Sequence, residues 1–424
     1  MLYYNRGSSD DIITPADMRA ALASVFTRLG RKQKVLVVPP DITRAHSQAG
    51  PLTRMIVEHY GAAVTDILPA VGTHDPMSEP EIAAMFGDLP RSLFRKHDFR
   101  NAVATLGEVP AEYVRTVSGG AVDYPIPVQV GSLMNDGGHD LILSVGQVVP
   151  HEVVGMANQS KNIFVGTGGV DSIHRTHFLG AAYGMERIMG RADTPVRKVL
   201  SYGMQHFAGH LPIMFVLTVI DRDKASGALV MRGLYIGDDD ECFTLAAGLS
   251  LQTNFALVEK PLRKVVVYLD PSEFKSTWLG NKSIYRTRMA IADGGELIVL
   301  APGVSKFGED ARIDALIRKY GYVGTRKVQE LVRENPDLGS NLSAAAHLMH
   351  GSSDGRFSIT YCPGGISREE IERANFGYAP LQDMLRRYDP GTLHDGLQML
   401  PGGEEIFYIS NPALGLWAHR DRMQ

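Results

Sequence analysis

The sequence predicts an α/β fold made of two α/β domains with mainly parallel sheets. Apolar, β-rich runs alternate with segments of helical spacing along much of the chain, which is typical of βαβ units. The chain has 424 residues, enough for two domains that each bury a sizeable core. Polar motifs follow closely after three predicted strands, as they do where the carboxyl ends of parallel strands form a ligand site.

The predicted N-terminal domain covers residues 1–258 and begins with alternating strand and helix. Short apolar runs that end in turns predict buried strands, and helical spacing over residues 52–60 predicts a helix between the first two. The predicted strands of this domain span residues 34–40, 64–71, 140–146, 213–220 and 228–236. A helix is expected to begin near Asp171, with that residue as its N-cap.

The predicted C-terminal domain covers residues 259–424. Residues 264–270 and 296–303 predict strands, and a helical segment with Arg286 and Arg288 lies between them. Two amphipathic helices are expected after the second strand, at residues 309–320 and 326–335. With a domain on each side, we expect the active site in the cleft between the two domains.

The composition is that of an ordinary soluble globular protein. Apolar residues make up 44%, charged residues 21%, and the net charge is −4. Because Lys and Arg are spread along the chain, no basic patch indicates a nucleic-acid partner. No apolar run has the length of a membrane span or a signal peptide, so we expect no membrane association and a cytoplasmic location. The two cysteines predict no disulfide framework.

The tetrapeptide after the first predicted strand, Asp41, Ile42, Thr43 and Arg44, carries groups suited to a nucleotide or an acid. The aspartate accepts hydrogen bonds from ribose hydroxyls, while the threonine hydroxyl and the guanidinium bind phosphate or carboxylate. The same four residues also fit a simple turn with a solvated arginine.

Two histidines follow other strands, His74 in the sequence Gly72-Thr73-His74 and His151 directly after Pro150. Each fits a surface loop as well as an acid/base role. Their common position at the carboxyl edge of one sheet favours the second reading, because two bases on opposite sides of a prochiral centre are what racemisation requires.

A third group of residues lies in the segment 161–177. Gly166 to Gly169 form a loop that could hold a phosphate, although the loop matches no dinucleotide or P-loop fingerprint. His174 and His177 are spaced to share one helix face and could bind zinc, but no third ligand is close in sequence. Lys161 alone indicates nothing beyond a solvated cation.

Taken together, these residues resemble the nickel-dependent lactate racemase family. The likeness is carried by Asp41 to Arg44, Gly72 to His74, Pro150 with His151, Lys161 ten residues later, and His177 sixteen residues after that lysine. Five elements in the family's order with two matching spacings make the likeness specific. It covers the N-terminal half firmly, and the two-domain layout extends it over most of the chain.

The resemblance implies a cofactor, the nickel-pincer nucleotide, Ni(II) pyridinium-3,5-bisthiocarboxylic acid mononucleotide. By position, Lys161 resembles the lysine that tethers this cofactor, and His177 resembles the protein ligand that completes the nickel plane. His74 and His151 resemble the acid/base pair. The segment from Asp41 through Ile42 and Thr43 to Arg44 resembles the one that touches the nucleotide, with Arg44 reaching the substrate carboxylate.

The implied activity is inversion at C2 of a 2-hydroxy acid by hydride transfer to the cofactor, with the two histidines moving the hydroxyl proton. Expected partners are the small-molecule substrate and the enzymes that make the cofactor. The sequence gives neither the acid nor the oligomeric state.

This chain departs from the family at positions that contact substrate. Where lactate racemases have a glutamine and a lysine, the strict register gives Arg286 and Met289, and Arg288 or Lys282 could replace the lysine. Asp75 stands where many relatives have arginine, and residues 156–160 replace a glycine-rich stretch. We therefore take Arg286 and Arg288 as substrate-binding candidates and expect a larger acid than lactate, such as a sugar acid or a hydroxy-dicarboxylate.

Two other functions stay open. A zinc-dependent hydrolase or lyase would use His174, His177 and another histidine, but it leaves Lys161 and the Asp41 to Arg44 segment without a role. A catalytically silent relative would bind a sugar acid without turning it over. Metal content separates the zinc enzyme from the racemase, and replacement of Lys161 by alanine separates the racemase from the silent relative.

Overall fold

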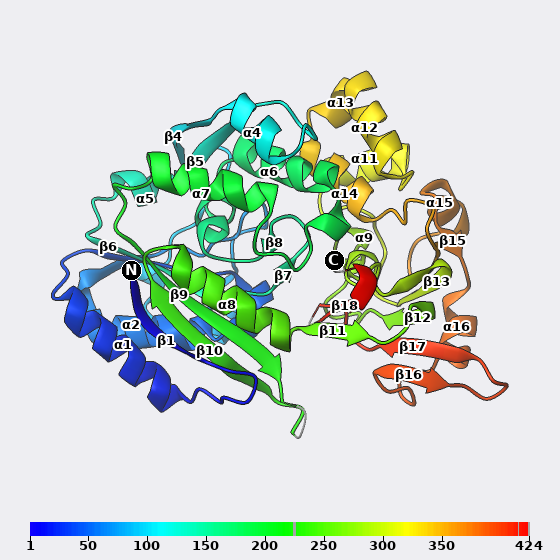
Figure 1. The fold of residues 1–424 in the computed structure, drawn as a ribbon, viewed down its shortest axis with the longest axis horizontal. Helices are drawn as coiled ribbons and strands as arrows, with labels where there is room; N and C mark the ends of the chain where they lie inside the picture. Colours follow the sequence, from blue (N-terminus) through cyan, green and yellow to red (C-terminus); the bar gives the residue numbers. More distant parts are fainter. Residues whose placement is uncertain (224–225, 414, 423–424) are drawn as a thin grey trace. The chain divides into compact units, whose positions relative to one another are not determined.

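Among the residues that the structure describes, two six-stranded sheets organise the chain, one in each of the two units into which it divides (Figure 1). The structure is a computed structural model that describes residues 1–223, 226–413 and 415–422. The first unit is Met1–Leu179 with Ile188–Asn254, and the second is Gly180–Arg187 with Phe255–Gln424. The division after Asn254 lies near the predicted boundary at residues 258 and 259, whereas the assignment of Gly180–Arg187 to the second unit was not predicted.

The sheet of the first unit is parallel at one side and antiparallel at the other. Its strand order is β1 (Leu2–Gly7), β10 (Leu229–Gly237), β9 (Ile213–Arg222), β6 (Leu141–Gln147), β2 (Val35–Val38) and β3 (Val64–Ile67). The four strands from β9 to β3 run parallel, and β10 and β1 add an antiparallel edge.

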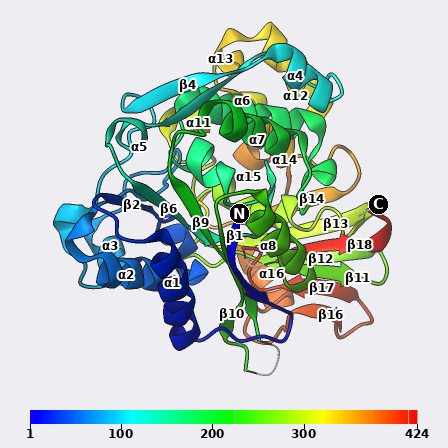
Figure 2. The same ribbon diagram turned by 60° about the vertical axis from the view of Figure 1, so that its left-hand side comes forward.

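Helices and two small antiparallel sheets complete the first unit. Its helices are α1 (Pro15–Leu29), α2 (Ala49–Tyr60), α3 (Glu79–Phe86), α4 (Ala111–Val117), α5 (Ser132–Asp136), α6 (Val170–Tyr183, which ends in the second unit), α7 (Pro195–Phe207) and α8 (Asp240–Thr253). The small sheets pair β4 (Val103–Val109) with β5 (Ile126–Gly131), and β7 (Pro150–His151) with β8 (Gly155–Met156). Figure 2 shows α1 and α2 on one side of the large sheet, with α6, α7 and the β4–β5 pair on the other.

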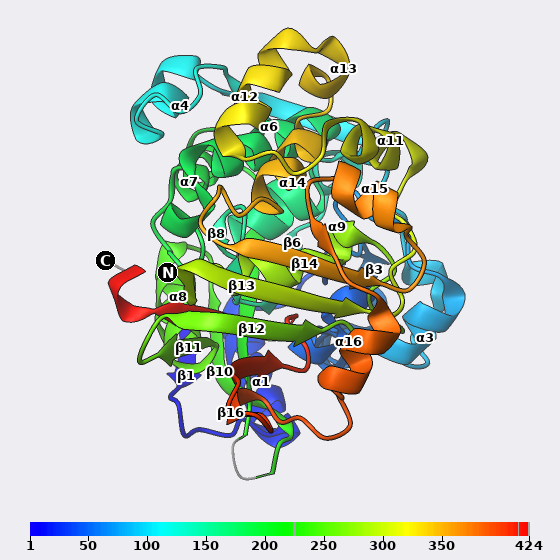
Figure 3. The ribbon, with the colours of Figure 1, turned by 90° about the vertical axis from the view of Figure 1, so that its right-hand side faces the viewer.

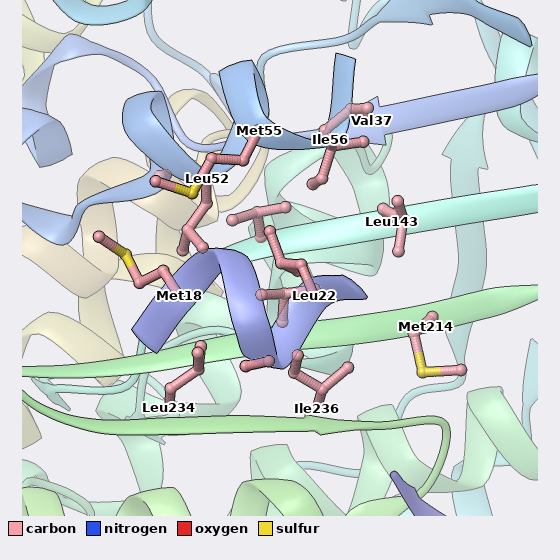
Figure 4. Packing of buried hydrophobic residues seen from close by; sticks show 14 of the residues in the cluster. Met18, Leu22, Val37, Leu52, Met55, Ile56, Leu143, Met214, Leu234 and Ile236 are labelled. Carbon is pink, nitrogen blue, oxygen red and sulfur yellow. The ribbon is translucent and has the colours of Figure 1, made fainter. Parts of the chain in front are cut away.

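The start of α1 shows how local sequence sets an element. Thr14 caps the helix by accepting from the Asp17 amide, the Asp17 carboxylate accepts from the Thr14 amide, and Pro15 occupies the first helical turn. The buried face of α1 then packs with α2 against the sheet. Figure 4 shows this core, which contains Leu22 and Leu52 of the helices and strand residues such as Leu143. Burying such side chains contributes about 1.5–3 kcal/mol each.

The second unit is built on a sheet that is parallel except at one edge. Its strand order is β15 (Gly377–Tyr378), β14 (Ser358–Pro363), β13 (Ile291–Ala301), β12 (Leu262–Tyr268), β17 (Glu405–Ile409) and β16 (Gly396–Met399). Only β16 runs antiparallel to its neighbour in this sheet. A separate parallel pair joins β11 (Phe255–Val258) to β18 (Leu416–His419).

The helices of the second unit are α9 (Thr277–Gly280), α10 (Lys282–Tyr285), α11 (Ala311–Tyr320), α12 (Thr325–Glu334), α13 (Pro336–Gly339), α14 (Leu342–His350), α15 (Arg368–Arg373) and α16 (Leu381–Arg387). Figure 3 faces β12, β13 and β14, with α16 crossing them. Leu381 and Met384 of α16 pack there on a core that includes Val266 and Ile298.

The α/β class and the mainly parallel sheets are confirmed, and each strand that the sequence predicts is present within a few residues. Two local predictions were wrong. Helix α6 begins at Val170, so Asp171 lies in its first turn, where its charge favours the helix dipole, and is not the N-cap. The helical segment around Arg286 is a single turn that ends at Tyr285. No helix among the described residues is long and apolar enough to cross a membrane.

Candidate functional site

Three adjacent parallel strands of the first unit lead into the predicted motifs. Strand β2 lies between β6 and β3, and all three run in the same direction. Asp41 follows β2, His74 follows β3 and His151 follows β6. These side chains therefore come from the carboxyl edge of one sheet. A bridge between Pro40 and Ala70 continues the β2–β3 pairing beyond the strands.

The segment after β2 turns at once into a short 3₁₀ helix, Ile42–Ser47, with Asp41 as its N-cap. One carboxylate oxygen of Asp41, Oδ1, accepts from the amide of Thr43 at 3.2 Å and from its hydroxyl at 2.5 Å. Ile42 packs against the apolar core of the unit. The turn thus leaves the second Asp41 oxygen, Oδ2, for another partner.

The second oxygen of Asp41 holds His74. His74 Nδ1 lies 2.6 Å from Asp41 Oδ2, and the carboxylate is buried while half of the imidazole is exposed. Burial raises the pKa of Asp41, but the hydrogen bonds from His74 and Thr43 and the charge of Arg44 hold that pKa below its usual value. An ionised carboxylate accepts the Nδ1 proton, which puts the lone pair of a neutral His74 on Nε2.

His151 is fixed in the opposite way. Its Nδ1 accepts the backbone N–H of Val153 at 3.1 Å, and its side chain is buried. Burial lowers the pKa of His151 well below its usual value; Glu152 opposes this shift, and Lys161 and Arg44 add to it. His151 is therefore neutral near pH 7, and its proton is on Nε2. The site presents one histidine with an Nε2 lone pair and one with an Nε2 proton.

Arg44 places a positive charge beside these residues. Its charge acts on Asp41, His151 and Lys161. Within residues 1–223, 226–413 and 415–422, its guanidinium has no hydrogen-bond or ion-pair partner. A partly buried arginine with its fork of donors unused is suited to bind a carboxylate in a bidentate way.

Lys161 lies close to the same charges. The pKa of its amine is lowered to about 8, chiefly by burial and then by the charge of Arg44, against the opposing charges of Glu152 and Asp41. Near neutral pH a sizeable fraction of this amine is uncharged, and only the uncharged form is a nucleophile. A surface lysine, with its usual pKa near 10.4, would be almost wholly protonated there.

The turn before Lys161 is strained. Asn158 and Gln159 have φ of 68° and 55°, so two consecutive non-glycine residues are left-handed. Each costs about 1–2 kcal/mol relative to a right-handed conformation. The turn forms without the glycine-rich stretch because hydrogen bonds from its own side chains and from a buried arginine hold it. That arginine is Arg197 at the start of α7, which sequence reasoning missed because nothing local connects it to this turn.

The glycine loop has a structural role. The amides of Thr167, Gly168 and Val170 all donate to backbone carbonyls of the protein, and the carbonyl of Gly168 accepts from buried His97 at 2.9 Å. These amides are therefore not available as a phosphate cradle. The carbonyl of Gly166 accepts from the amide of Gly72 at 2.8 Å, which joins the loop to the segment that carries His74.

His177 lies on α6, partly buried, with its Nδ1 2.7 Å from the carbonyl of Ile173. Because a carbonyl only accepts, Nδ1 carries the proton and Nε2 the lone pair, the tautomer of a metal-ligating imidazole. The described residues contain no group of three or more His, Cys, Asp or Glu that could hold a metal ion. His174 and His177 therefore have no third protein ligand of the kind that the zinc interpretation requires.

The structure does not support the substrate role predicted for Arg286 and Arg288. Arg286 is buried, and its Nη1 donates to the carbonyls of Ala413 at 3.1 Å and Gly415 at 3.0 Å. Arg288 is buried as well. It donates to the Ser352 carbonyl and pairs with the carboxylates of two acidic residues of its own unit, Glu186 and Asp354. Position along the sequence pointed to these two arginines, but it gave no information on the carbonyls and carboxylates to which they donate within the fold.

The second unit also contains a cavity of about 740 Å³, lined by residues 322–327, 352–355, 357–360 and 375–377 with Glu330. It shares no residue with the group around Asp41. The helix N-terminus at its edge is already capped, since the amides of Gly324 and Thr325 donate to Ser352 and Asp354. We therefore assign the candidate site to the carboxyl edge of the first sheet.

Comparison with known proteins gives a family match for the part of the chain that carries these residues. Residues 17–187 match the family model of the lactate racemase N-terminal domain, and a search of curated proteins gave no match. A crystal structure of a Thermotoga maritima protein is similar, with 23% identity, a TM-score of 0.82, and coverage of 98% of this chain and all of that one. The lactate racemase apoprotein from Thermoanaerobacterium thermosaccharolyticum has 16% identity and a TM-score of 0.67, over 96% of this chain and 90% of that one.

At these identities the two structures establish the fold, while the family model covers the strands and turns that carry Asp41, His74, His151, Lys161 and His177. Residues 17–187 therefore match the lactate racemase N-terminal domain family, and over most of the chain the fold is that of the two solved structures.

Proposed function

We propose that this protein is a racemase or epimerase that inverts the C2 centre of a 2-hydroxy acid and uses a nickel-pincer nucleotide held by Lys161 and His177. The observation that carries the proposal is the pair of opposite histidine tautomers. His74 offers an Nε2 lone pair because its Nδ1–H donates to Asp41, and His151 offers an Nε2–H because its Nδ1 accepts the Val153 amide. Inversion needs a group that removes and returns the hydroxyl proton, and a donor that holds the same oxygen from the other side.

The residues present fit the cofactor. The lowered pKa of Lys161 gives an uncharged amine for covalent attachment. The Nδ1 proton of His177 is held by a backbone carbonyl, which leaves Nε2 as the donor atom for a metal. A single histidine suits a metal whose other ligands come from the cofactor. When bound, the nickel-pincer nucleotide supplies a reversible hydride acceptor next to the substrate.

The protein residues supply binding and proton transfer. Arg44 binds the substrate carboxylate through its unused donors. The Nε2 atom of His74 accepts the proton of the 2-hydroxyl, and Asp41 stabilises the imidazolium that forms. From the other side of the centre, the neutral ring of His151, which burial favours, donates a hydrogen bond from its Nε2–H to the same oxygen. The protonated His74 then returns the proton that it accepted. Holding all three groups on one sheet edge fixes their orientation.

The expected preference for a larger acid relied on Arg286 and Arg288 as extra cationic groups. Because both are engaged within the second unit, that support is gone. We therefore propose the class of 2-hydroxy acids as the substrate, with the carboxylate and the 2-hydroxyl as the recognised groups. Pure enantiomers or epimers of acids from lactate to sugar acids form the panel for the assay.

The test is to produce the protein together with the enzymes that make the cofactor. We expect a mass increase of one cofactor at Lys161 with about one nickel per chain, and inversion of at least one acid of the panel. Lys161→Ala should abolish the adduct, and Lys198→Ala, which alters a half-exposed lysine, should not. Wild-type protein with neither adduct nor nickel would refute the proposal.

A further inference from the structure

Arg197 is buried at the start of α7 and donates its hydrogen bonds to the turn before Lys161. Its Nη2 lies 2.6 Å from the carbonyl of Met156. Its Nη1 lies 2.8 Å from Ser160 Oγ and 3.1 Å from Gln159 Oε1, and both terminal nitrogens lie 3.3 Å from the carbonyl of Asn158. One guanidinium thus contacts every residue of the turn but Ala157.

The guanidinium is itself held in place. Its carbon lies 4.0 Å from the ring centroid of Phe243 on α8, a cation–π contact in a buried setting. The side-chain amide of Gln159 also donates to Asp240 of the same helix at 2.8 Å. Burial lowers the pKa of Arg197 to about 9, and Asp240 opposes that shift, so the group stays charged near neutral pH.

The turn needs such a clamp because it is strained. Asn158 and Gln159 are both left-handed. The Asn158 side chain accepts from the backbone N–H of Gln159 at 2.8 Å, and the Gln159 side chain accepts from the backbone N–H of Ser160 at 2.7 Å. On its other side the turn is joined to the sheet. Asn162 donates its side-chain amide to the carbonyl of Val38 at 3.1 Å and to Ser144 at 2.9 Å. Lys161 therefore lies between two fixed points.

We propose that Arg197 is a positioning residue for Lys161: its guanidinium holds the left-handed turn at Asn158 and Gln159 and so places the Lys161 amine for attachment of the cofactor. The use of the amine rests on the proposed function, whereas the clamp itself does not. Arg197 would then do with side-chain hydrogen bonds what glycines would do by conformational freedom. Its positive charge also helps to lower the pKa of Lys161.

The test measures the reactivity of Lys161 in protein produced without the cofactor. Trace acetic anhydride acetylates uncharged amines and releases acetate, and mass spectrometry gives the acetylation rate of each lysine as a function of pH. Exposed Lys96 serves as the internal reference. In the wild type, Lys161 should have its half-maximal rate near pH 8.

Four changes separate positioning from charge and from general stability. Arg197→Lys keeps a cation but loses the fork of donors, and Arg197→Met loses both. Ser160→Ala removes one acceptor of the clamp while leaving Arg197 in place, which covers the case in which the Arg197 variants fail to fold. Lys198→Met, at the neighbouring position of α7, removes a half-exposed cation as the matched control.

We expect Arg197→Lys and Arg197→Met to reduce the acetylation rate of Lys161 relative to Lys96 by about tenfold at pH 7.5, equivalent to a rise of about one pKa unit. Ser160→Ala should reduce the same relative acetylation rate by a smaller factor, and Lys198→Met should leave that rate unchanged. Replacing both Asn158 and Gln159 by glycine should restore much of the rate in Arg197→Lys, because glycine is not strained in a left-handed turn.

An unchanged Lys161 profile in the folded Arg197 variants and in Ser160→Ala would overturn the inference. The inference would also be overturned if glycine at positions 158 and 159 failed to restore any of the Lys161 acetylation rate in Arg197→Lys. Cofactor loading separates the two proposals. If wild-type protein takes up the cofactor and Arg197→Lys does so equally well, the inference fails and the proposed function stands. If the wild type takes up none while the acetylation rates change as expected, the proposed function fails and the clamp stands.

Discussion

His74 and Asp41 are 33 positions apart in the chain, yet His74 Nδ1 lies 2.6 Å from Asp41 Oδ2. The contact joins the ends of two adjacent parallel strands. It assigns Asp41 a role in orienting the histidine, beyond the nucleotide contact that the family resemblance implies. The same carboxylate is held by Thr43 through its other oxygen, so its position is fixed from two sides.

Asp41→Asn should lower turnover more than it lowers substrate affinity. An amide does not fix the Nδ1 proton of His74 and does not stabilise the imidazolium, so we expect kcat to fall by about 10²- to 10⁴-fold. The cofactor adduct at Lys161 should persist. Asp75→Asn, which removes an exposed neighbouring charge, is the control for electrostatics alone. Steady-state rates of inversion decide this, and wild-type kcat in Asp41→Asn would contradict the assigned role.

Arg44→Lys should raise KM. Lysine keeps the charge but cannot bind a carboxylate through two parallel hydrogen bonds, so we expect kcat/KM to fall by about 10- to 100-fold, in line with about 1.5–3 kcal/mol for a hydrogen bond to a charged group. Arg44→Met should also raise the pKa of Lys161, since Arg44 is the strongest charge that lowers it. Unaltered KM in both variants would place the substrate carboxylate elsewhere.

His151 should make the unfolding free energy depend on pH. Its pKa in the folded protein is well below its usual value, so below about pH 6.5 the unfolded chain binds a proton that the folded protein does not. Stability contributed by the neutral ring is complete above the unfolded pKa and decreases as the pH falls below it. We therefore expect the unfolding free energy of cofactor-free protein, measured with urea at several pH values between 5 and 7, to depend less steeply on pH in His151→Gln than in the wild type. Equal slopes would show that His151 titrates normally.

His177→Ala should separate metal binding from cofactor attachment. The adduct at Lys161 should still form, while bound nickel falls to background, because the lysine and the imidazole are different contacts. His174→Ala, one turn away on the same helix, should retain both. Intact mass together with metal analysis gives both readings. Full nickel content in His177→Ala would mean that another residue ligates the metal.

Arg288→Met should destabilise the fold and leave KM of correctly folded protein unchanged. Its removal takes one partner from partly buried Glu186 and one from exposed Asp354, and we expect a loss of about 2–3 kcal/mol, chiefly from Glu186. Thermal unfolding and KM measured on the same preparation distinguish this from the substrate role that the sequence predicted. A raised KM at unchanged stability would restore that role.

The strands were predictable because buried parallel strands are visible in local sequence. Residues 35–38 and 265–268 are continuous apolar β-rich runs, and both lie in strands with a neighbour on each side. Placement of His74 and His151 at one edge followed from topology alone. The side-chain partners did not follow, because the contacts Asp41–His74 and Arg197–Ser160 join positions far apart in the chain. The partners of Arg286 and Arg288 also lie at distant positions, Ala413 and Gly415 for the first and Glu186 and Asp354 for the second.

The eight residues Gly180–Arg187 affect how chimeras of this protein could be made. They lie within the matched N-terminal domain in sequence, yet they belong to the second unit, where Glu186 meets Arg288, Arg356 and Arg422. A fragment that ends at Asn254 carries the glutamate without any of the three arginines. A chimera of two relatives therefore needs three junctions, before residue 180, after residue 187 and after residue 254. Glu186 and its three arginines then come from the same parent.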